Sequence, residues 1–110
     1  MCVVAIYANG SGGAHIAETG ETTVKITTID SLGIAPTFIK MDIEGHEIPA
    51  LYGVKNTIIK HKPKLAISIY HKGSDLWEIP LLIKSWIPEY KMYIRHHSAN
   101  FCDTVLYATC

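Results

Sequence analysis

A chain of 110 residues, of which 48% are hydrophobic and 18% are charged, has enough apolar side chains to bury one core, which excludes a disordered chain. Ten Lys and Arg residues balance ten Asp and Glu residues, and a net charge of zero excludes the strongly basic surface that binds nucleic-acid phosphates. We therefore expect one globular unit, residues 1–110, without a nucleic-acid partner.

Residues 1–30 have the pattern of a strand-and-loop hairpin region. Segment 3–8 is apolar, NGSGG supplies turn residues, and segment 22–29 alternates polar and apolar side chains. The stretch NGSGGAH follows a strand, as a dinucleotide-binding loop would. However, His15 takes the place of the third glycine, and no room remains for the long helix that binds phosphate. A hairpin loop is the better prediction.

Residues 37–70 predict a strand, a helical segment and a second strand. The apolar stretch 37–42 ends at EGHE, and apolar residues then recur at helical spacing up to Ile59. Pro49 fits only the first helical turn, and Gly53 is a point at which the segment can divide into two short helices. Pro63 ends the segment. KLAISIY at 64–70 is apolar on both faces, as expected of a strand covered by helices on both sides of its sheet.

Residues 75–109 predict a helix and then two antiparallel strands. Asp75 and Glu78 are suited to cap a helix that runs to about residue 86. Its expected apolar face is Leu76, Ile79, Leu82, Ile83 and Trp86, and the wider core is expected to include Leu65, Ile67, Ile69 and Trp77. Segments 90–96 and 104–109 are joined by a short loop. The order βαβαββ over 37–110 predicts an α/β fold with a mainly parallel sheet and an antiparallel C-terminal strand.

Residues just after each parallel strand are the candidates for a site, because open α/β sheets bind ligands outside the carboxyl ends of their strands. Those candidates are Asp42, Glu44, His46 and Glu47 after the first strand, Tyr70, His71 and Lys72 after the second, and Arg95, His96 and His97 after the third. Neighbouring strands lie about 4.8 Å apart, so Asp42 and His71 can reach one small ligand if their strands pair.

Asp42 is the strongest of these candidates, because a carboxylate that closes a buried strand needs a ligand, a metal or a specific donor. Glu44 and Glu47 are equally well explained as groups that cap the next helix and complement its dipole. His71 is explained as well by a surface loop as by proton transfer near neutral pH. The segment 95–97 is better explained by a solvated strand end.

Two motifs lie close together in the chain: TTIDSL at 27–32 and KMDIEGHE at 40–47. They correspond to the T-x-x-D-x-L and K-[IM]-D-[IV]-E-G-x-E patterns of the FkbM methyltransferases, and residues 24–107 resemble the C-terminal part of that family. The resemblance implies a partial Rossmann-like class I methyltransferase fold with its N-terminal strands missing. It also implies S-adenosylmethionine as the methyl donor and a hydroxyl acceptor on a sugar, lipid or secondary metabolite.

The same resemblance assigns roles to residues. It implies that Asp30, Asp42 and Glu44 bind the cofactor and that Glu47 is a further acidic position of the same pattern. With Tyr70 and His71 from the neighbouring strand end, we expect Glu47 to bind the small-molecule acceptor. Methyl transfer depends on positioning and electrostatics, and a hydroxyl acceptor must also lose a proton. We therefore expect Asp42 and His71 to be catalytic: Asp42 orients a reactant, Asp42 or His71 accepts the proton, and Glu44 shapes the pocket.

Two alternatives stay open. One is a small protein that binds a divalent metal through Asp42, Glu44, His71, His96 and His97, although no pre-spaced set such as H-x-x-x-H is present. The other is a non-catalytic remnant that associates with a partner. A half-sheet exposes an edge through which copies of the chain can form a homo-oligomer.

The cysteines and the first residues of the chain indicate where in the cell the protein is located. Cys2, Cys102 and Cys110 are odd in number and widely spaced, a pattern that favours reduced thiols in a cytoplasmic protein. The initial apolar run, of about seven residues with no basic segment, is too short for a signal peptide or a membrane span. We expect a cytoplasmic location without a membrane partner.

Overall fold

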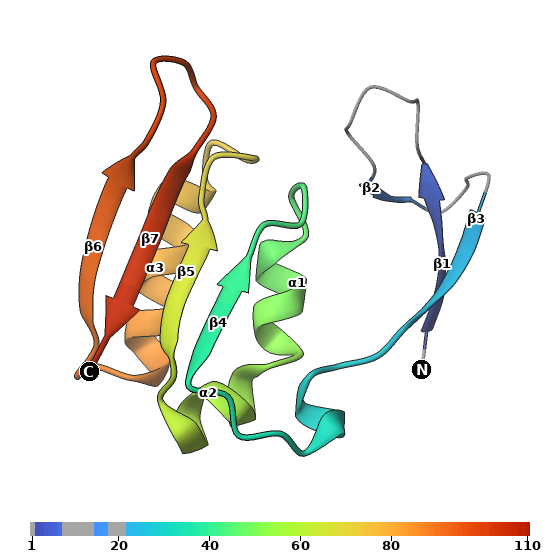
Figure 1. Ribbon diagram of the computed structural model, residues 1–110, viewed down its shortest axis with the longest axis horizontal. Helices are drawn as coiled ribbons and strands as arrows, with labels where there is room; N and C mark the ends of the chain where they lie inside the picture. Colours follow the sequence, from blue (N-terminus) through green and yellow to red (C-terminus); the bar gives the residue numbers. More distant parts are fainter. Residues whose placement is uncertain (1, 8–14, 18–21) are drawn as a thin grey trace.

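The computed structural model describes residues 2–7, 15–17 and 22–110. Two sheets are present in these ranges (Figure 1). The smaller sheet is antiparallel, with order β2-β1-β3, and consists of β1 (Cys2–Tyr7), β2 (His15–Ala17) and β3 (Thr22–Ile26). The glycine-rich loop predicted at 9–13 lies outside the described residues, and the strands on either side of it, β1 and β2, pair antiparallel.

The larger sheet is mixed. It has the order β4-β5-β7-β6, with β4 (Phe38–Met41), β5 (Lys64–Ser68), β6 (Lys91–His96) and β7 (Thr104–Thr109). Strands β4 and β5 are parallel, whereas β7 is antiparallel to both of its neighbours. The predicted antiparallel pair β6–β7 is confirmed. The prediction of a mainly parallel sheet is wrong, because β7 turns back through a short loop and lies between β5 and β6, which makes two of the three ladders antiparallel.

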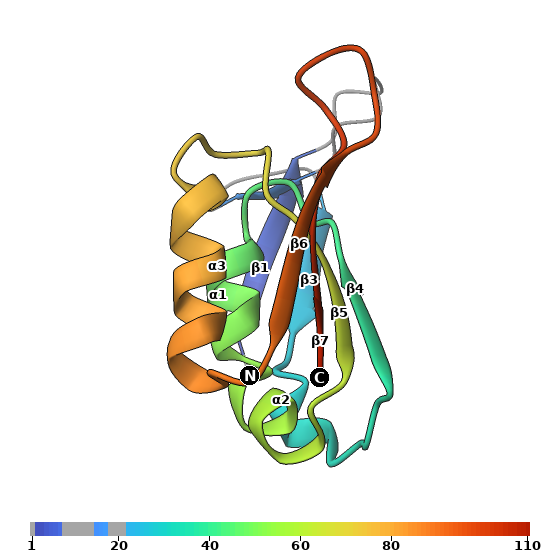
Figure 2. The same ribbon diagram turned by 90° about the vertical axis from the view of Figure 1, so that its left-hand side faces the viewer.

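Three helices lie against one face of this sheet (Figure 2): α1 (Glu47–Tyr52), α2 (Lys55–His61) and α3 (Asp75–Trp86). The predicted break at Gly53 is confirmed, since α1 ends before it and α2 begins after it. Within the described chain, the helices cover one face of β5 rather than the two predicted. On the other face Ala66 is only 6% exposed, because it lies between Lys40 and Tyr107 in the sheet register, and these longer side chains shield it.

The core lies between the sheet and the helices. Its fully buried members include Leu51, Val54, Ile58, Leu65, Ile67, Ile69, Ile79, Ile83, Tyr90 and Leu106. The predicted burial of Trp77 is wrong, because it is 56% exposed. Trp77 precedes Ile79 by two residues, which is about 200° around the helix, so it points away from the sheet. Leu76 is 48% exposed at the first turn of α3, whereas Trp86 packs against the core.

Two further features of the fold bear on later arguments. The hydroxyl group of buried Tyr90 donates a hydrogen bond to the backbone carbonyl of Pro63 and so joins the segments that begin β6 and β5. In the portion of the chain that the structure describes, no helix is long and apolar enough to cross a membrane.

Candidate functional site

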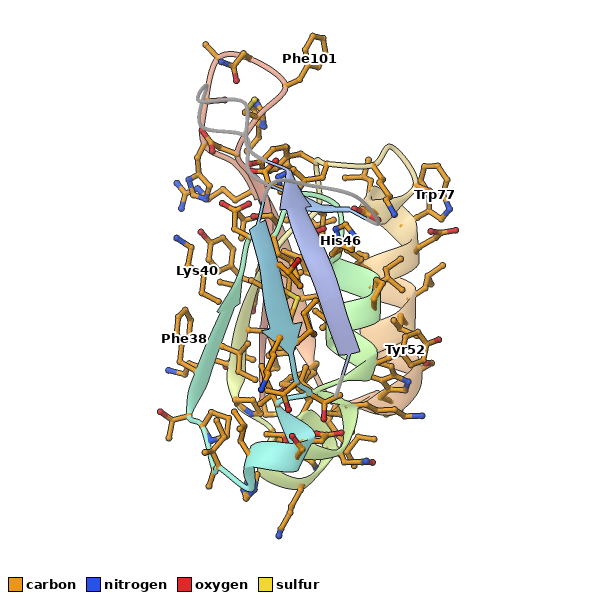
Figure 3. The ribbon with its side chains drawn as sticks, turned by 90° about the vertical axis from the view of Figure 1, so that its right-hand side faces the viewer. Phe38, Lys40, His46, Tyr52, Trp77 and Phe101 are labelled. Atoms are coloured by element: carbon orange, nitrogen blue, oxygen red, sulfur yellow. The ribbon has the colours of Figure 1, made fainter. Side chains whose placement is uncertain are left out.

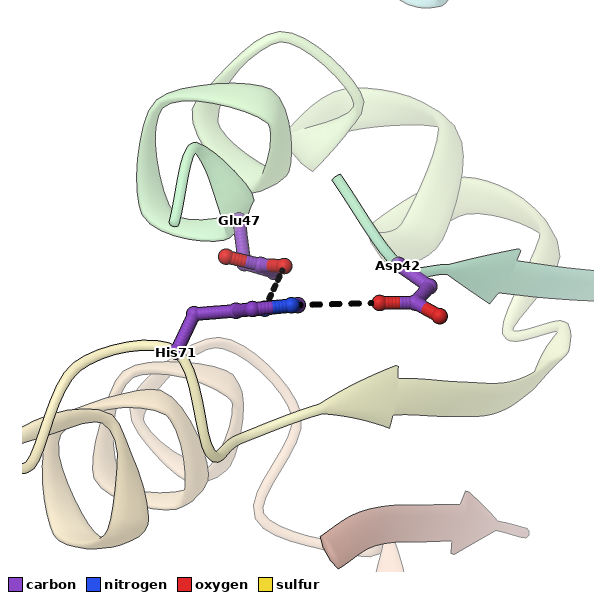
Figure 4. A group of neighbouring side chains, drawn as sticks. All are labelled: Asp42, Glu47 and His71. Carbon is purple, nitrogen blue, oxygen red and sulfur yellow. Dashed lines mark hydrogen bonds and ion pairs between the residues drawn. The ribbon is translucent and has the colours of Figure 1, made fainter. Parts of the chain in front are cut away.

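The parallel pairing of β4 with β5 brings polar side chains from two separate segments to one edge of the sheet. Asp42 directly follows β4, and His71 lies in the loop after β5. Because the two strands pair in the same direction, both residues lie beyond their carboxyl ends. Glu47, the first residue of α1, joins them (Figure 4), and the Asp42 and His71 side chains approach to 3.4 Å.

A left-handed turn between β4 and α1 brings Glu47 back toward this edge. Glu44 and Gly45 have φ values of 55° and 94°. The Ile43 N–H donates to Glu47 Oε1 at 3.0 Å, which closes the turn. A Cβ at Gly45 would lie 3.5 Å from Lys72 Cε, so the turn is in close contact with the loop after β5. Glycine is needed at this position for its backbone conformation.

Glu47 and His71 form a buried pair. Glu47 is 0% exposed and the His71 side chain is 8% exposed. Glu47 Oε1, which already accepts the Ile43 N–H, lies 2.8 Å from His71 Nδ1. Because a carboxylate oxygen can only accept, His71 donates from Nδ1 to Glu47. We had predicted that Glu47 contacts the acceptor, but the structure places it behind His71.

The second ring nitrogen of His71 faces carboxylates. Nε2 lies 3.4 Å from Asp42 Oδ1 and 3.4 Å from Glu44 Oε2, and it is buried without a hydrogen-bond partner. The Tyr70 ring packs on His71 at a centroid distance of 4.1 Å, and its hydroxyl group donates to Asp42 Oδ1 at 3.5 Å. Burial and then the charges of Asp42 and Glu44 raise the pKa of Tyr70 to about 12, so the phenol remains a donor at neutral pH.

Asp30, which we predicted to bind the cofactor, lies elsewhere. Its turn, residues 30–32, is next to α2, at the end of the sheet opposite to the carboxyl end of β4 (Figure 1). Its carboxylate accepts hydrogen bonds from Asn56 N at 3.1 Å and from Thr57 N and Thr57 Oγ1, both at 2.8 Å. Burial opposes ionisation, but these hydrogen bonds outweigh it and lower the pKa of Asp30. The structure thus shows Asp30 as a cap of α2.

The histidines at the end of β6 are not brought to the Asp42 cluster. His96 Nδ1 lies 2.8 Å from Thr104 Oγ1, and His97 Nε2 lies 2.9 Å from the Tyr107 hydroxyl group, so both rings are engaged within the β6–β7 hairpin. Tyr107 and His97 border a hollow of about 440 Å³ on the sheet face opposite to the helices, and Asp42 also lines it. Phe38 and Lys40 point out from this face (Figure 3).

Sequence reasoning missed the buried state of Asp75. It was predicted as a helix cap, but it is the first residue of α3, is 1% exposed, and leaves Oδ2 without a partner. Burial and then the nearby charge of Glu47 raise the pKa of Asp75. A carboxyl group at a helix start is ordinarily a solvated cap, so nothing in the sequence separates this case from the usual one.

Comparison with known proteins identifies the family to which the chain belongs. The model of the methyltransferase FkbM domain matches residues 6–99. The crystal structure of a methyltransferase FkbM from Methylobacillus flagellatus KT is similar, with 47% sequence identity and a TM-score of 0.74, over 78% of this chain and 23% of that chain. The chain therefore spans about a quarter of that relative's length. No curated protein matches the chain. The chain belongs to the FkbM methyltransferase domain family.

Proposed function

We propose that the protein containing this chain transfers a methyl group from S-adenosylmethionine to a hydroxyl group of a small acceptor, such as a sugar, a lipid or a secondary metabolite. Membership of the FkbM family supports methyl transfer in general. One observation supports the location: the buried Glu47–His71 pair presents a ring nitrogen to Asp42 and Glu44 at the carboxyl edge of β4 and β5.

The charge at this edge fits the proposed donor. S-adenosylmethionine supplies a methyl group on a positively charged sulfonium and also carries an ammonium group. Asp42 and Glu44 have side chains that are 43% and 45% exposed, and they add to the effect of burial in raising the pKa of Tyr70, which indicates a negative potential. The negative charge of Asp42 and Glu44 would therefore favour binding of the cationic donor at this edge. We leave Asp30 out of the proposed site, because its carboxylate is engaged at α2.

The residues around Asp42 also include groups that can accept the proton of the acceptor hydroxyl group. As the hydroxyl oxygen bonds to the methyl carbon, the carbon–sulfur bond breaks and its electron pair stays on sulfur, while the hydroxyl proton must leave. His71 Nε2 and Asp42 Oδ1 lie 3.4 Å apart, and we assign the proton to one of these two groups. Glu47 orients His71 by fixing the hydrogen on Nδ1, and Tyr70 donates to Asp42.

The test measures donor binding and turnover in the longest polypeptide that carries this chain. Formation of S-adenosylhomocysteine is followed with a panel of hydroxyl acceptors. Asp42→Asn and His71→Ala should each lower turnover at least about 100-fold. The matched controls Glu89→Gln and His61→Ala lie outside the cluster and should stay within about twofold. Failure to form S-adenosylhomocysteine with any hydroxyl acceptor, or full turnover in both site variants, would contradict the proposal.

A further inference from the structure

Three atoms that can bind a cation converge beyond the end of β4. They are His71 Nε2, Asp42 Oδ1 and Glu44 Oε2, and Nε2 lies 3.4 Å from each oxygen. Glu47 binds Nδ1, so Nε2 is the ring nitrogen that faces the two carboxylates. A buried polar atom without a partner is unfavourable, and a cation bound between Nε2 and the two carboxylates would satisfy all three groups. Within the described residues, Nε2 has no hydrogen-bond partner.

The arrangement has the features of a metal-binding histidine. Such a histidine ordinarily donates its other ring N–H to a carboxylate, as His71 does to the wholly buried Glu47. Ligand atoms at about 2.1 Å from a tetrahedrally coordinated cation lie about 3.4 Å apart, and Nε2 lies at this distance from Asp42 Oδ1 and from Glu44 Oε2. Ligand-capable atoms of Asp42, Glu47 and His71 all lie within 4.8 Å of one another.

We propose that His71 Nε2, Asp42 and Glu44 bind one divalent cation, and that Glu47 orients His71 for this purpose. One imidazole with two carboxylates suits Mn²⁺ or Zn²⁺ better than Ca²⁺, which prefers oxygen ligands alone. Three protein ligands leave a coordination position open, and an oxygen of a small molecule can fill it.

The catalytic role of the cation rests on the proposed function, whereas cation binding itself does not. A hydroxyl acceptor at the open position would lose its proton more readily, because a bound divalent cation stabilises the oxyanion that remains. With Nε2 bound to a cation, the carboxylate of Asp42 would be the group left to accept the proton. Cation binding thus decides between the two proton acceptors that the proposed function leaves open.

The first test uses Mn²⁺ alone, titrated into chelator-treated protein and followed by electron paramagnetic resonance. We expect one bound Mn²⁺ per chain and a hyperfine coupling to an imidazole nitrogen. Asp42→Asn and Glu44→Gln should each weaken binding at least about tenfold, and Glu47→Gln should weaken it about 10- to 100-fold. Glu89→Gln and His61→Ala are the matched controls and should bind as the wild type does.

Two results would overturn the inference: no stoichiometric binding up to about 1 mM Mn²⁺, or equal affinity in the wild type, Asp42→Asn and His71→Ala. Asp42 and Glu44 are half-exposed, so their variants should keep the fold even if His71→Ala does not, and thermal melts check this. The experiments can contradict the proposed function and the proposed cation site independently of each other. Bound Mn²⁺ without methyl transfer to any hydroxyl acceptor contradicts the proposed function, and methyl transfer by chelated protein that binds no Mn²⁺ contradicts the cation site.

Discussion

Replacement of Asp30 by alanine should destabilise the fold by removing the only side-chain cap that the structure shows at the start of α2. Val54, the residue before α2, makes no side-chain cap, and Asp30 supplies it from 26 to 27 residues away. Its carboxylate accepts two backbone N–H groups and the Thr57 hydroxyl group. Loss of a capping side chain costs about 0.5–2 kcal/mol, and charge-assisted hydrogen bonds lie at the stronger end. We expect a loss of about 1.5–2 kcal/mol in the free energy of unfolding.

The pH dependence of this loss has a definite sign. The pKa of Asp30 in the folded chain is lowered from its ordinary value of 3.8, despite burial, by the hydrogen bonds from Thr57 and Asn56. Stabilisation by such a group is complete above the ordinary value and is lost as pH falls through the lowered pKa. The difference between wild type and Asp30→Ala, measured by urea denaturation, should be full at about pH 7 and smaller at about pH 3.

A second substitution at this position separates capping from cofactor binding. Asp30→Asn keeps one acceptor oxygen for Thr57 but turns an NH₂ group toward the Asn56 N–H, so about half of the loss should remain. Neither variant should change the affinity of folded protein for S-adenosylmethionine, measured by titration calorimetry. Unchanged stability of Asp30→Ala would refute the capping argument. Weaker donor binding at unchanged stability would instead support the prediction from sequence that Asp30 binds the cofactor.

Three further substitutions test the turn, the core and a buried phenol. Gly45→Ala puts a side chain at φ 94° and should cost about 1–3 kcal/mol in thermal melts, whereas Gly73→Ala, whose new Cβ meets no atom within 4 Å, is its control. Ile83→Ala should cost about 2–5 kcal/mol by denaturation, while Leu81→Ala on the exposed side of α3 should change little. Burial raises the pKa of Tyr90 to about 12 from its ordinary value of 10.0. The contribution of Tyr90 to the stability of the fold is therefore complete below pH 10.0. Denaturation of Tyr90→Phe should show a loss of about 1 kcal/mol at neutral pH that disappears as pH rises toward the raised pKa.

The local elements of this fold could be predicted from the sequence because their signals are local. Pro63 ends a helix by removing an N–H, and Gly53 marks the break between α1 and α2. The position of β7 could not be predicted in this way. Whether β7 pairs with β6 alone or also with β5 depends on packing between segments about 40 residues apart, as in the pair Leu65 and Ala108. The prediction that Trp77 is buried rested on its hydrophobicity alone. Its exposure is decided instead by its angular position around α3.

The approach of Asp42 to His71 followed from one rule, that parallel strands end at the same edge of a sheet. The roles of their neighbours did not follow from it. Glu47 was expected to touch a substrate, yet it is fully buried, since the turn before α1 directs it toward Nδ1 of His71. Asp30 matches an acidic position of the family pattern, but its place beside α2 emerges only when the connection before β4 is folded.

One turn of the backbone accounts for most of the candidate site. Glu44 and Glu47 are three residues apart, and the positive φ values at Glu44 and Gly45 place their carboxylates at the two ring nitrogens of the same histidine. An ordinary extended or helical path through 44–45 would not bring both carboxylates to His71. The left-handed turn therefore places Glu47, which orients the ring, and Glu44, whose charge the ring faces, at the same time. A substitution that straightens this turn should therefore impair cation binding and the Glu47–His71 hydrogen bond together, whereas Glu44→Gln should impair the first alone.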